Sequence, residues 1–227
     1  ALGLEYCGTA FTGWKTQPDG RGVQDALERA RAAIAAADIG TIAAGRTDAG
    51  VHATMQVVHF ETGATRPHSA WVRGVNAKLP ATVAVLWARP VADEFHARYA
   101  AVRRHYTYLL SGRSARPALL AGRTGWYHRR LAVALMSEAA GALVGTHDFS
   151  AFRAAECQAK SPIRTLSTAS VTLTGEHLRF DFSANAFLQH MIRNIVGALV
   201  YVGAGKHPPA WIGELLAGRD RRRAAPT

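Results

Sequence analysis

Hydrophobic and polar positions alternate along this chain with two different periods, and the changes of period predict a mixture of strands and helices. Alternation with period two, or a short apolar run, predicts strands at Leu2–Tyr6, Gln56–Thr62 and Thr82–Trp87. Apolar residues that recur on one helical face predict a helix at Gln24–Ala37 and a second one near His68–Ala77. The first 92 residues are therefore predicted to run strand, helix, strand, helix, strand.

From Phe95 onward, the second half of the chain is again predicted to contain both strands and helices. Strands and helices in this arrangement predict an α+β fold, with helices packed on one side of antiparallel sheets. We place the boundary between the two halves after residue 92, which gives regions 1–92 and 93–227. The predicted elements of the second region are, in order, a strand at Tyr106–Leu110, a helix with an apolar face from Leu135 to Leu143, paired strands at Ser161–Thr174 and Leu178–Ser183, and helices at Phe187–Val202 and Trp211–Leu216.

The predicted helix Phe187–Val202 is apolar on both faces, because Gly197 and Tyr201 lie on the side that carries its polar residues. Such a helix is expected to be covered on both faces. Arg193, on the polar side, is then expected to face an enclosed site, where a guanidinium needs an anion. The alternative is an Arg193 whose stem packs while its charged end reaches solvent, and the pattern alone does not separate the two.

The charge of the chain points to a polyanionic partner. Lysine and arginine outnumber aspartate and glutamate by 27 to 16, which gives a formal charge of +11 and a pI near 10.5. RNA or DNA fits this charge better than an acidic small molecule, and a generic basic protein is the alternative. Arginine supplies most of the charge, and its planar guanidinium suits bidentate phosphate contacts and stacking on bases.

The cysteines, the histidines and the longest apolar runs argue against a disulfide-bonded protein, a metalloprotein and a membrane protein. Cys7 and Cys157 are far apart and have no metal-binding spacing, so they predict neither a disulfide framework nor a zinc site, which fits a reducing cytoplasm. His52 and His59 are seven residues apart along a predicted strand and face opposite ways, and we expect neither a metal nor another cofactor. No signal peptide and no membrane-spanning run is visible, so no membrane association is expected.

The residues of greatest chemical interest are the nine at Gly45–Ala53, which read Gly-Arg-Thr-Asp-Ala-Gly-Val-His-Ala. They lie between two predicted strands, the short apolar run Ile39–Ala44 and Gln56–Thr62. Gly45 and Gly50 allow backbone angles or close approaches that a β-carbon forbids. The loop can thereby present Asp48 outward, with the Arg46 guanidinium two residues away. The alternative is an ordinary turn in which Asp48 accepts a local backbone hydrogen bond.

This nonapeptide resembles the signature of the tRNA pseudouridine synthase A family, and four other stretches resemble family blocks in family order. The resemblance implies an isomerase that converts uridine to pseudouridine in tRNA, with uridines of the anticodon stem-loop as substrates and a homodimer that binds tRNA across both subunits. It also implies two similar halves whose sheets join with the active-site cleft between them, and a further strand after the position of Thr227. The five blocks are Glu5–Trp14, Gly45–Ala53, Asp93–Arg98, Arg103–Tyr108 and Asn185–Asn194.

The signature aspartate is the catalytic residue of the family, so the resemblance implies this role for Asp48. Detaching uracil from C1′ and rejoining it through C5 involves no hydrolysis and no redox step, and one carboxylate can suffice. Asp48 is expected to act as a nucleophile on the sugar or on the uracil ring, or as the base that removes the 2′ proton. The resemblance places Arg193 as the partner of this carboxylate.

The remaining candidate residues concern RNA binding. The target base is stacked in RNA, so the enzyme has to extract it and hold it against an apolar face. Tyr106 resembles the family's active-site tyrosine in that role, whereas Tyr108 is expected to be a half-buried strand residue. Arg46 resembles the signature arginine that contacts RNA around the flipped base. Arg103 and Arg104 are candidate phosphate contacts, and each arginine taken alone has the alternative of a solvated surface charge.

Two other classes of protein compete with this interpretation. An RRM-like RNA-binding protein without catalytic activity shares α+β halves with aromatic strand residues, but it has no need of the Gly45–Ala53 loop. A nucleoside or glycoside hydrolase normally requires two carboxylates that flank the bond, and the next acidic residue after Asp48 is Glu61. A carboxylate brought close by the fold would restore the hydrolase interpretation.

Overall fold

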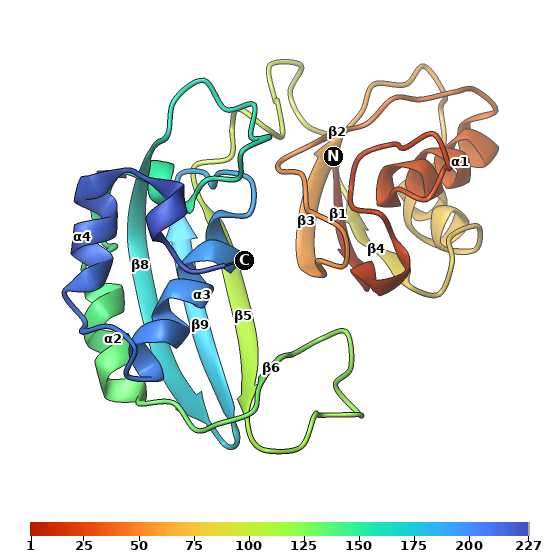
Figure 1. Cartoon of the computed structure of the whole chain (residues 1–227). Helices are drawn as coiled ribbons and strands as arrows, with labels where there is room; N and C mark the ends of the chain where they lie inside the picture. The colour runs from red at the N-terminus through yellow and green to blue at the C-terminus, as the bar shows by residue number, and fades with distance from the viewer. Residues whose placement is uncertain (227) are drawn as a thin grey trace. The chain divides into compact units, whose positions relative to one another are not determined.

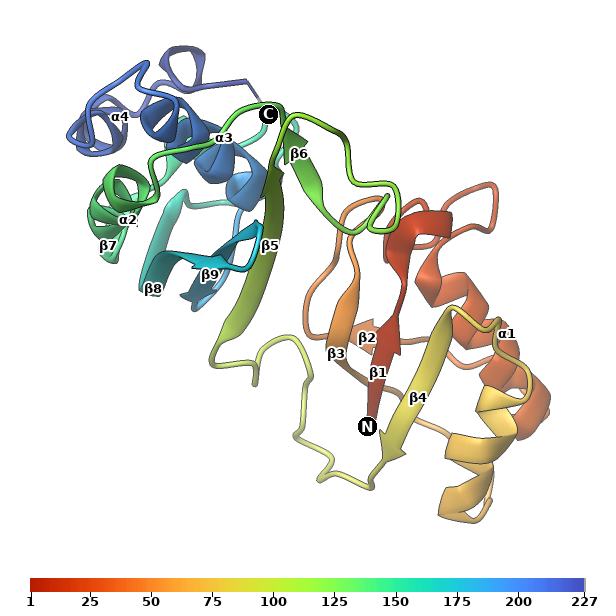
Figure 2. The ribbon, with the colours of Figure 1, turned by 90° about the horizontal axis from the view of Figure 1, so that it is seen from below.

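The computed structural model describes residues 1–226 and forms two compact units, Ala1–Ala101 and Val102–Thr227. Each unit contains one sheet with its helices on one face (Figures 1 and 2). The predicted α+β class, with two sheets in two halves, is therefore confirmed.

The first unit contains a four-stranded antiparallel sheet. The predicted strands near residues 2, 56 and 82 are all present, whereas only two residues of the apolar run before Gly45 are extended. The spatial order of the strands is β2 (Ile42–Ala43), β3 (Ala53–His59), β1 (Leu2–Tyr6) and β4 (Val83–Ala88).

Two helical segments cover one face of this sheet, α1 (Val23–Ala35) and a helical segment at residues 68–76, whose Ala70–Gly74 part is wound as a π-helix. Alternate residues of β1, Leu2 and Leu4, point into the resulting core and are almost fully buried. Gly3 faces the opposite side, where a Cβ would come within 2.1 Å of the Trp87 indole. Glycine is therefore required at this position of β1.

The second unit contains a five-stranded sheet that is antiparallel except at one pair. The short edge strand β6 runs parallel to β5, while all other pairs are antiparallel. The two edge strands were not predicted, because each has only three or four residues and no clear alternation. The spatial order is β6 (Gly125–Tyr127), β5 (Arg104–Gly112), β9 (His177–Ala184), β8 (Ile163–Thr174) and β7 (Gly145–Asp148).

Three helices cover one face of this second sheet: α2 (Val133–Gly141), α3 (Met191–Gly203) and α4 (Trp211–Gly218) (Figure 1). A Cβ on Gly197 of α3 would lie 2.6 Å from the carbonyl oxygen of Pro226. The segment before the C-terminus therefore packs on α3, as expected for a helix that is apolar on both faces.

The start of α3 differs from the prediction. The helix begins at Met191, and residues 185–190 form a non-helical connection that ends with His190 in the left-handed region at φ 58°. Phe187 consequently does not belong to the apolar face of the helix. Its ring packs instead on the ring of Tyr106 in β5.

The segment after β4 belongs to the first unit up to Ala101. The backbone N–H of Ala97 donates to Nδ1 of His59 at 3.1 Å, and Ala97 is buried. This bond ties the segment to β3. Within residues 1–226, no helix is long and apolar enough to cross a membrane.

Candidate active site

The Gly45–Ala53 loop connects β2 to β3, and its first residues are held by the neighbouring strand. The N–H of Ala44 donates to the carbonyl of Val57 at 2.8 Å. The side-chain amide of Gln56, which is buried, donates to the carbonyl of Gly45 at 2.7 Å. A buried amide with a backbone partner fixes the direction in which the chain leaves the sheet.

Thr47, the residue before the candidate catalytic aspartate, is anchored from two sides. Its Oγ1 lies 2.9 Å from the hydroxyl of Tyr6, and its carbonyl accepts the N–H of Trp14 at 2.9 Å. Gly13 makes room for this contact, because a Cβ there would be 2.9 Å from the Thr47 carbonyl oxygen. Burial raises the pKa of Tyr6, and hydrogen bonds with the side chains of Thr47 and Gln56 oppose this effect.

The residues after Asp48 form a tight turn that packs against a second loop. The N–H of Val51 donates to the carbonyl of Asp48 at 3.2 Å, and Gly50 adopts φ 77°, a left-handed conformation that favours glycine. A Cβ on Gly8 would lie 2.1 Å from the Val51 carbonyl oxygen, so the two loops touch through their backbones. The N–H of Gly8 also donates to Nδ1 of His52 at 3.3 Å.

These contacts bring together two of the five sequence blocks, Glu5–Trp14 and Gly45–Ala53. The backbone is anchored on both sides of Asp48, and the aspartate itself is half-buried. Arg46 is exposed. The loop therefore presents a carboxylate on a constrained backbone, which is the arrangement that a positioned nucleophile or base requires.

Tyr106 lies on β5 opposite Phe182 of β9 and is half-buried. Its ring meets the ring of Phe187 edge to face, with centroids 5.1 Å apart and an interplanar angle of 84°. Edge-to-face packing fixes the orientation of both rings. Phe187 lies in one of the five sequence blocks but had no predicted role, and its position on Tyr106 follows from the non-helical connection before α3.

The two arginines before Tyr106 differ in their surroundings. Nη1 of Arg104 donates to the carbonyl of Asn185 at 2.6 Å, whereas Arg103 is exposed. The Asn185 side chain in turn accepts the N–H of Thr165 at 3.1 Å. Arg104 thus holds the connection that carries Phe187, and Arg103 is the more accessible of the two.

Arg193 lies in the first turn of α3, near Tyr108 of β5. Burial raises the pKa of Tyr108, and the positive charge of Arg193 opposes this rise. Arg193 is exposed within the second unit. Tyr108 is half-buried against Phe180, as expected for a strand tyrosine.

The structure thus gathers the predicted site residues in two groups. The first unit holds Asp48 and Arg46 in one loop. The second unit brings the blocks Arg103–Tyr108 and Asn185–Asn194 together through the contacts described above.

Comparison with known proteins assigns the family. A family model described as tRNA pseudouridine synthase matches residues 4–100 and 139–227. The chain belongs to this family. It is 59% identical over 227 residues to the tRNA pseudouridine synthase A of Thiobacillus denitrificans, and 60% identical over 228 residues to that of Chromobacterium violaceum. Each comparison covers 100% of this chain and 87% of the relative.

Family membership confirms the resemblance noted in the five sequence blocks and the predicted enzyme class, an isomerase that forms pseudouridine in tRNA. The RRM-like and hydrolase alternatives are not favoured. Among residues 1–226, no group of three histidine, cysteine, aspartate or glutamate side chains is arranged to hold a metal ion.

The environment of one thiol beside the Gly45–Ala53 loop was not predicted from the sequence. Cys7 is partly exposed, and its Sγ lies 3.5 Å from Oγ1 of Thr9. Hydrogen bonds with Thr9, and a smaller contribution from the His52 imidazole, lower the pKa of the Cys7 thiol to about 7. His52 is far from Cys7 in sequence, so only the fold reveals this environment.

Proposed function

We propose that Asp48 is the catalytic carboxylate with which this chain converts uridine to pseudouridine in tRNA. The observation that carries the proposal is the anchoring of the backbone on both sides of Asp48, through Thr47 and through the turn that ends at Val51. A carboxylate on a backbone fixed in this way loses little entropy when it meets a substrate. Membership of the tRNA pseudouridine synthase family supports the choice of reaction.

The reaction balances without a redox partner or a consumed water. The bond between N1 of uracil and C1′ breaks, the base rotates, and a bond between C5 and C1′ forms, while the C5 proton is lost and N1 gains a proton. Asp48 can serve as the nucleophile on the sugar or the ring, or as the base that removes the 2′ proton. Each of these roles requires the ionised carboxylate.

In this proposal, residues of the second unit act on the same substrate. Tyr106 stacks on the flipped uracil and is kept in orientation by Phe187. Arg193 serves as the counter-ion of Asp48. Arg103 and Arg104 contact phosphates, and Arg103 is the better placed because Arg104 already binds a backbone carbonyl.

The finer features of the function rest on the family resemblance. We propose that the substrates are uridines of the anticodon stem-loop, that Arg46 contacts RNA around the flipped base, and that the enzyme acts as a homodimer in the cytoplasm without a metal. The charge of +11 supports binding of a long polyanion.

The decisive test is Asp48→Asn, which is nearly isosteric. We expect the variant to fold and bind transcript tRNA like the parent while its pseudouridine formation, measured by nucleoside chromatography, falls below about a thousandth of the parent rate, or roughly 4 kcal/mol of barrier. Arg46→Gln, in the same loop, is the control and should weaken tRNA binding more than turnover. Substantial residual turnover in a cleanly purified Asp48→Asn protein would remove Asp48 from the catalytic role.

A further inference from the structure

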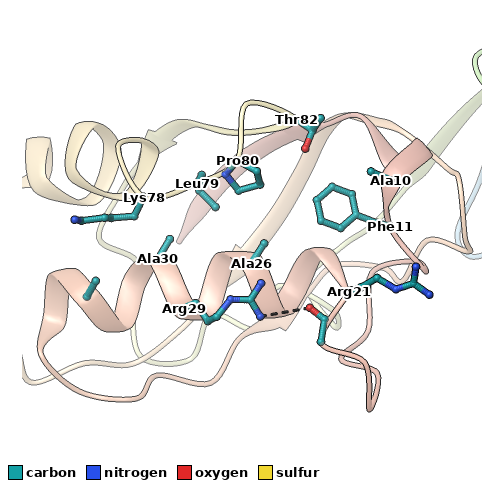
Figure 3. A pocket seen from close by; sticks show the side chains of 12 residues that line it. Ala10, Phe11, Arg21, Ala26, Arg29, Ala30, Lys78, Leu79, Pro80 and Thr82 are labelled. Carbon is teal, nitrogen blue, oxygen red and sulfur yellow. Dashed lines mark hydrogen bonds between the residues drawn. The ribbon is translucent and has the colours of Figure 1, made fainter.

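A groove of about 680 Å³ lies in the first unit, away from the Asp48 side chain. Figure 3 shows α1 along one side and the turn around Pro80 along the other, with Phe11 at one end. The candidate catalytic residues do not line it. The groove is thus a feature that the proposed reaction does not explain.

The groove combines an apolar floor with a cationic rim. Phe11, Leu79 and Pro80 supply carbon surface, together with small alanines of α1. Arg29 extends from α1, and Lys78 extends from the facing turn (Figure 3). None of the lining residues among those that the structure describes is acidic.

Two of the three rim cations are available to an anion. Arg21 already pairs with Asp19, with 2.7 Å between Nε and Oδ2. Arg29 contacts only the carbonyl of Gly20, at 3.4 Å, and within the described residues neither Arg29 nor Lys78 has an ion-pair partner. Both side chains are exposed: Arg29 is directed toward the carbonyl of Gly20, whereas Lys78 points away from the Phe11 end of the groove (Figure 3).

We propose that this groove binds a short stretch of the bound tRNA that does not contain the reacting uridine, with backbone phosphates at Arg29 and at Lys78 and a base against Phe11 and Pro80. Guanidinium and ammonium groups attract a phosphodiester, and an aromatic ring beside an apolar floor accepts any base face. An apolar, partly aromatic floor beside cations favours RNA over an acidic peptide, because RNA carries a planar base next to every phosphate. The inference rests on the proposed function, since it takes tRNA as the ligand.

The segment from Gly8 to Gly13, which forms one end of the groove, also packs against the Gly45–Ala53 loop. Ala10 and Phe11 line the groove, while Gly8 and Gly13 contact the backbones of Val51 and Thr47. The two sets of contacts are only a few residues apart in the chain. RNA held in the groove therefore lies against the same segment on which the Asp48 turn packs.

The test compares Lys78 with Arg73, which is exposed on the helical segment of the same unit and does not line the groove. Lys78→Ala is expected to raise the Kd for transcript tRNA by about threefold at low salt, and Lys78→Glu by about tenfold, because alanine no longer attracts the phosphate and glutamate repels it. Arg29→Ala combined with Lys78→Ala is expected to reduce the log–log salt slope by about 0.7 for each phosphate that is no longer neutralised. Lys78→Arg should restore binding.

The effect should appear in KM rather than in kcat, since the phosphate is bound both in the substrate complex and in the transition state. Equal effects of Lys78→Glu and Arg73→Glu on Kd and on the salt slope would overturn the proposal and leave only a general effect of charge. An unchanged Kd together with an altered sedimentation coefficient would show a protein occupant instead. If Asp48→Asn keeps full turnover while the Lys78 effect persists, the assignment of Asp48 fails and the groove assignment stands.

Discussion

The hydroxyl of Tyr6 lies 2.9 Å from Oγ1 of Thr47, although 41 residues separate them in the sequence. This contact joins β1 of the first sheet to the residue directly before Asp48. Tyr6 is almost fully buried and belongs to the core between the sheet and α1. The position of the candidate catalytic loop therefore depends on the hydrophobic core of the first unit.

Tyr6→Phe is expected to reduce kcat by roughly three- to tenfold with little change in KM, because the loop keeps its shape but loses one anchor. The free energy of unfolding should fall by about 1 kcal/mol, the usual net contribution of one hydrogen bond. A double-mutant cycle with Thr47→Val, measured by chemical denaturation, gives the coupling energy. Additive effects of the two substitutions would show that the bond does not contribute.

Tyr106→Leu is expected to reduce turnover far more than tRNA affinity, because phosphate contacts elsewhere hold the RNA while the flipped base loses its aromatic face. A loss of about 1–3 kcal/mol of stacking corresponds to roughly five- to 150-fold in kcat. Tyr106→Phe is the matched control, since it keeps the ring that packs on Phe187. Normal turnover in a folded Tyr106→Leu protein would place the stacking surface elsewhere.

Arg193→Met is expected to lower kcat by at least about tenfold, or ~1.4 kcal/mol, if its guanidinium is the counter-ion of Asp48. Arg193→Lys keeps the charge and should retain part of the activity. The same substitution has a spectroscopic readout within the second unit. Arg193 opposes the effect of burial on Tyr108, so its removal should raise the pKa of Tyr108 further.

That shift is measured by ultraviolet titration of tyrosinate, with Tyr108→Phe as the assignment control. The pKa of Tyr108 should rise because the charged form of tyrosine is the deprotonated one, and Arg193→Met removes a cation that stabilises this form. Because the folded-state pKa is already above the ordinary value of 10.0, stability should decline as pH rises above that value. The decline should be steeper in Arg193→Met. An unchanged titration would mean that Arg193 does not act on Tyr108.

Cys7 is expected to react with iodoacetamide at a rate that reaches half its maximum near pH 7, in line with its lowered pKa. An unperturbed thiol has its midpoint near pH ~8.5. Thr9→Ala should move the midpoint upward most, and His52→Ala should move it upward less, because Thr9 is the larger cause. Peptide mapping separates Cys7 from the buried Cys157. A midpoint above about 8 in the parent protein would contradict the assigned environment.

Local patterns in the sequence predicted much of the secondary structure, because they act over a few residues. The two long strands of the second unit, separated by Gly175 in the left-handed conformation at φ 60°, follow from alternation and one glycine. The Gly45–Ala53 loop was located in the same way, because two glycines interrupt a strand pattern. The family blocks identified the enzyme from residue order alone.

Contacts between distant residues were decided only by the tertiary structure. Arg104 binds the carbonyl of Asn185 across 81 residues, and β6 pairs with β5 in a parallel direction that three residues cannot encode. The environment of Cys7 and the two hydrogen bonds that anchor Thr47 likewise depend on residues that are distant in the sequence. Sequence periodicity records which face of an element is buried, but the partner on that face depends on how the sheets and helices pack, and this packing places the candidate catalytic loop.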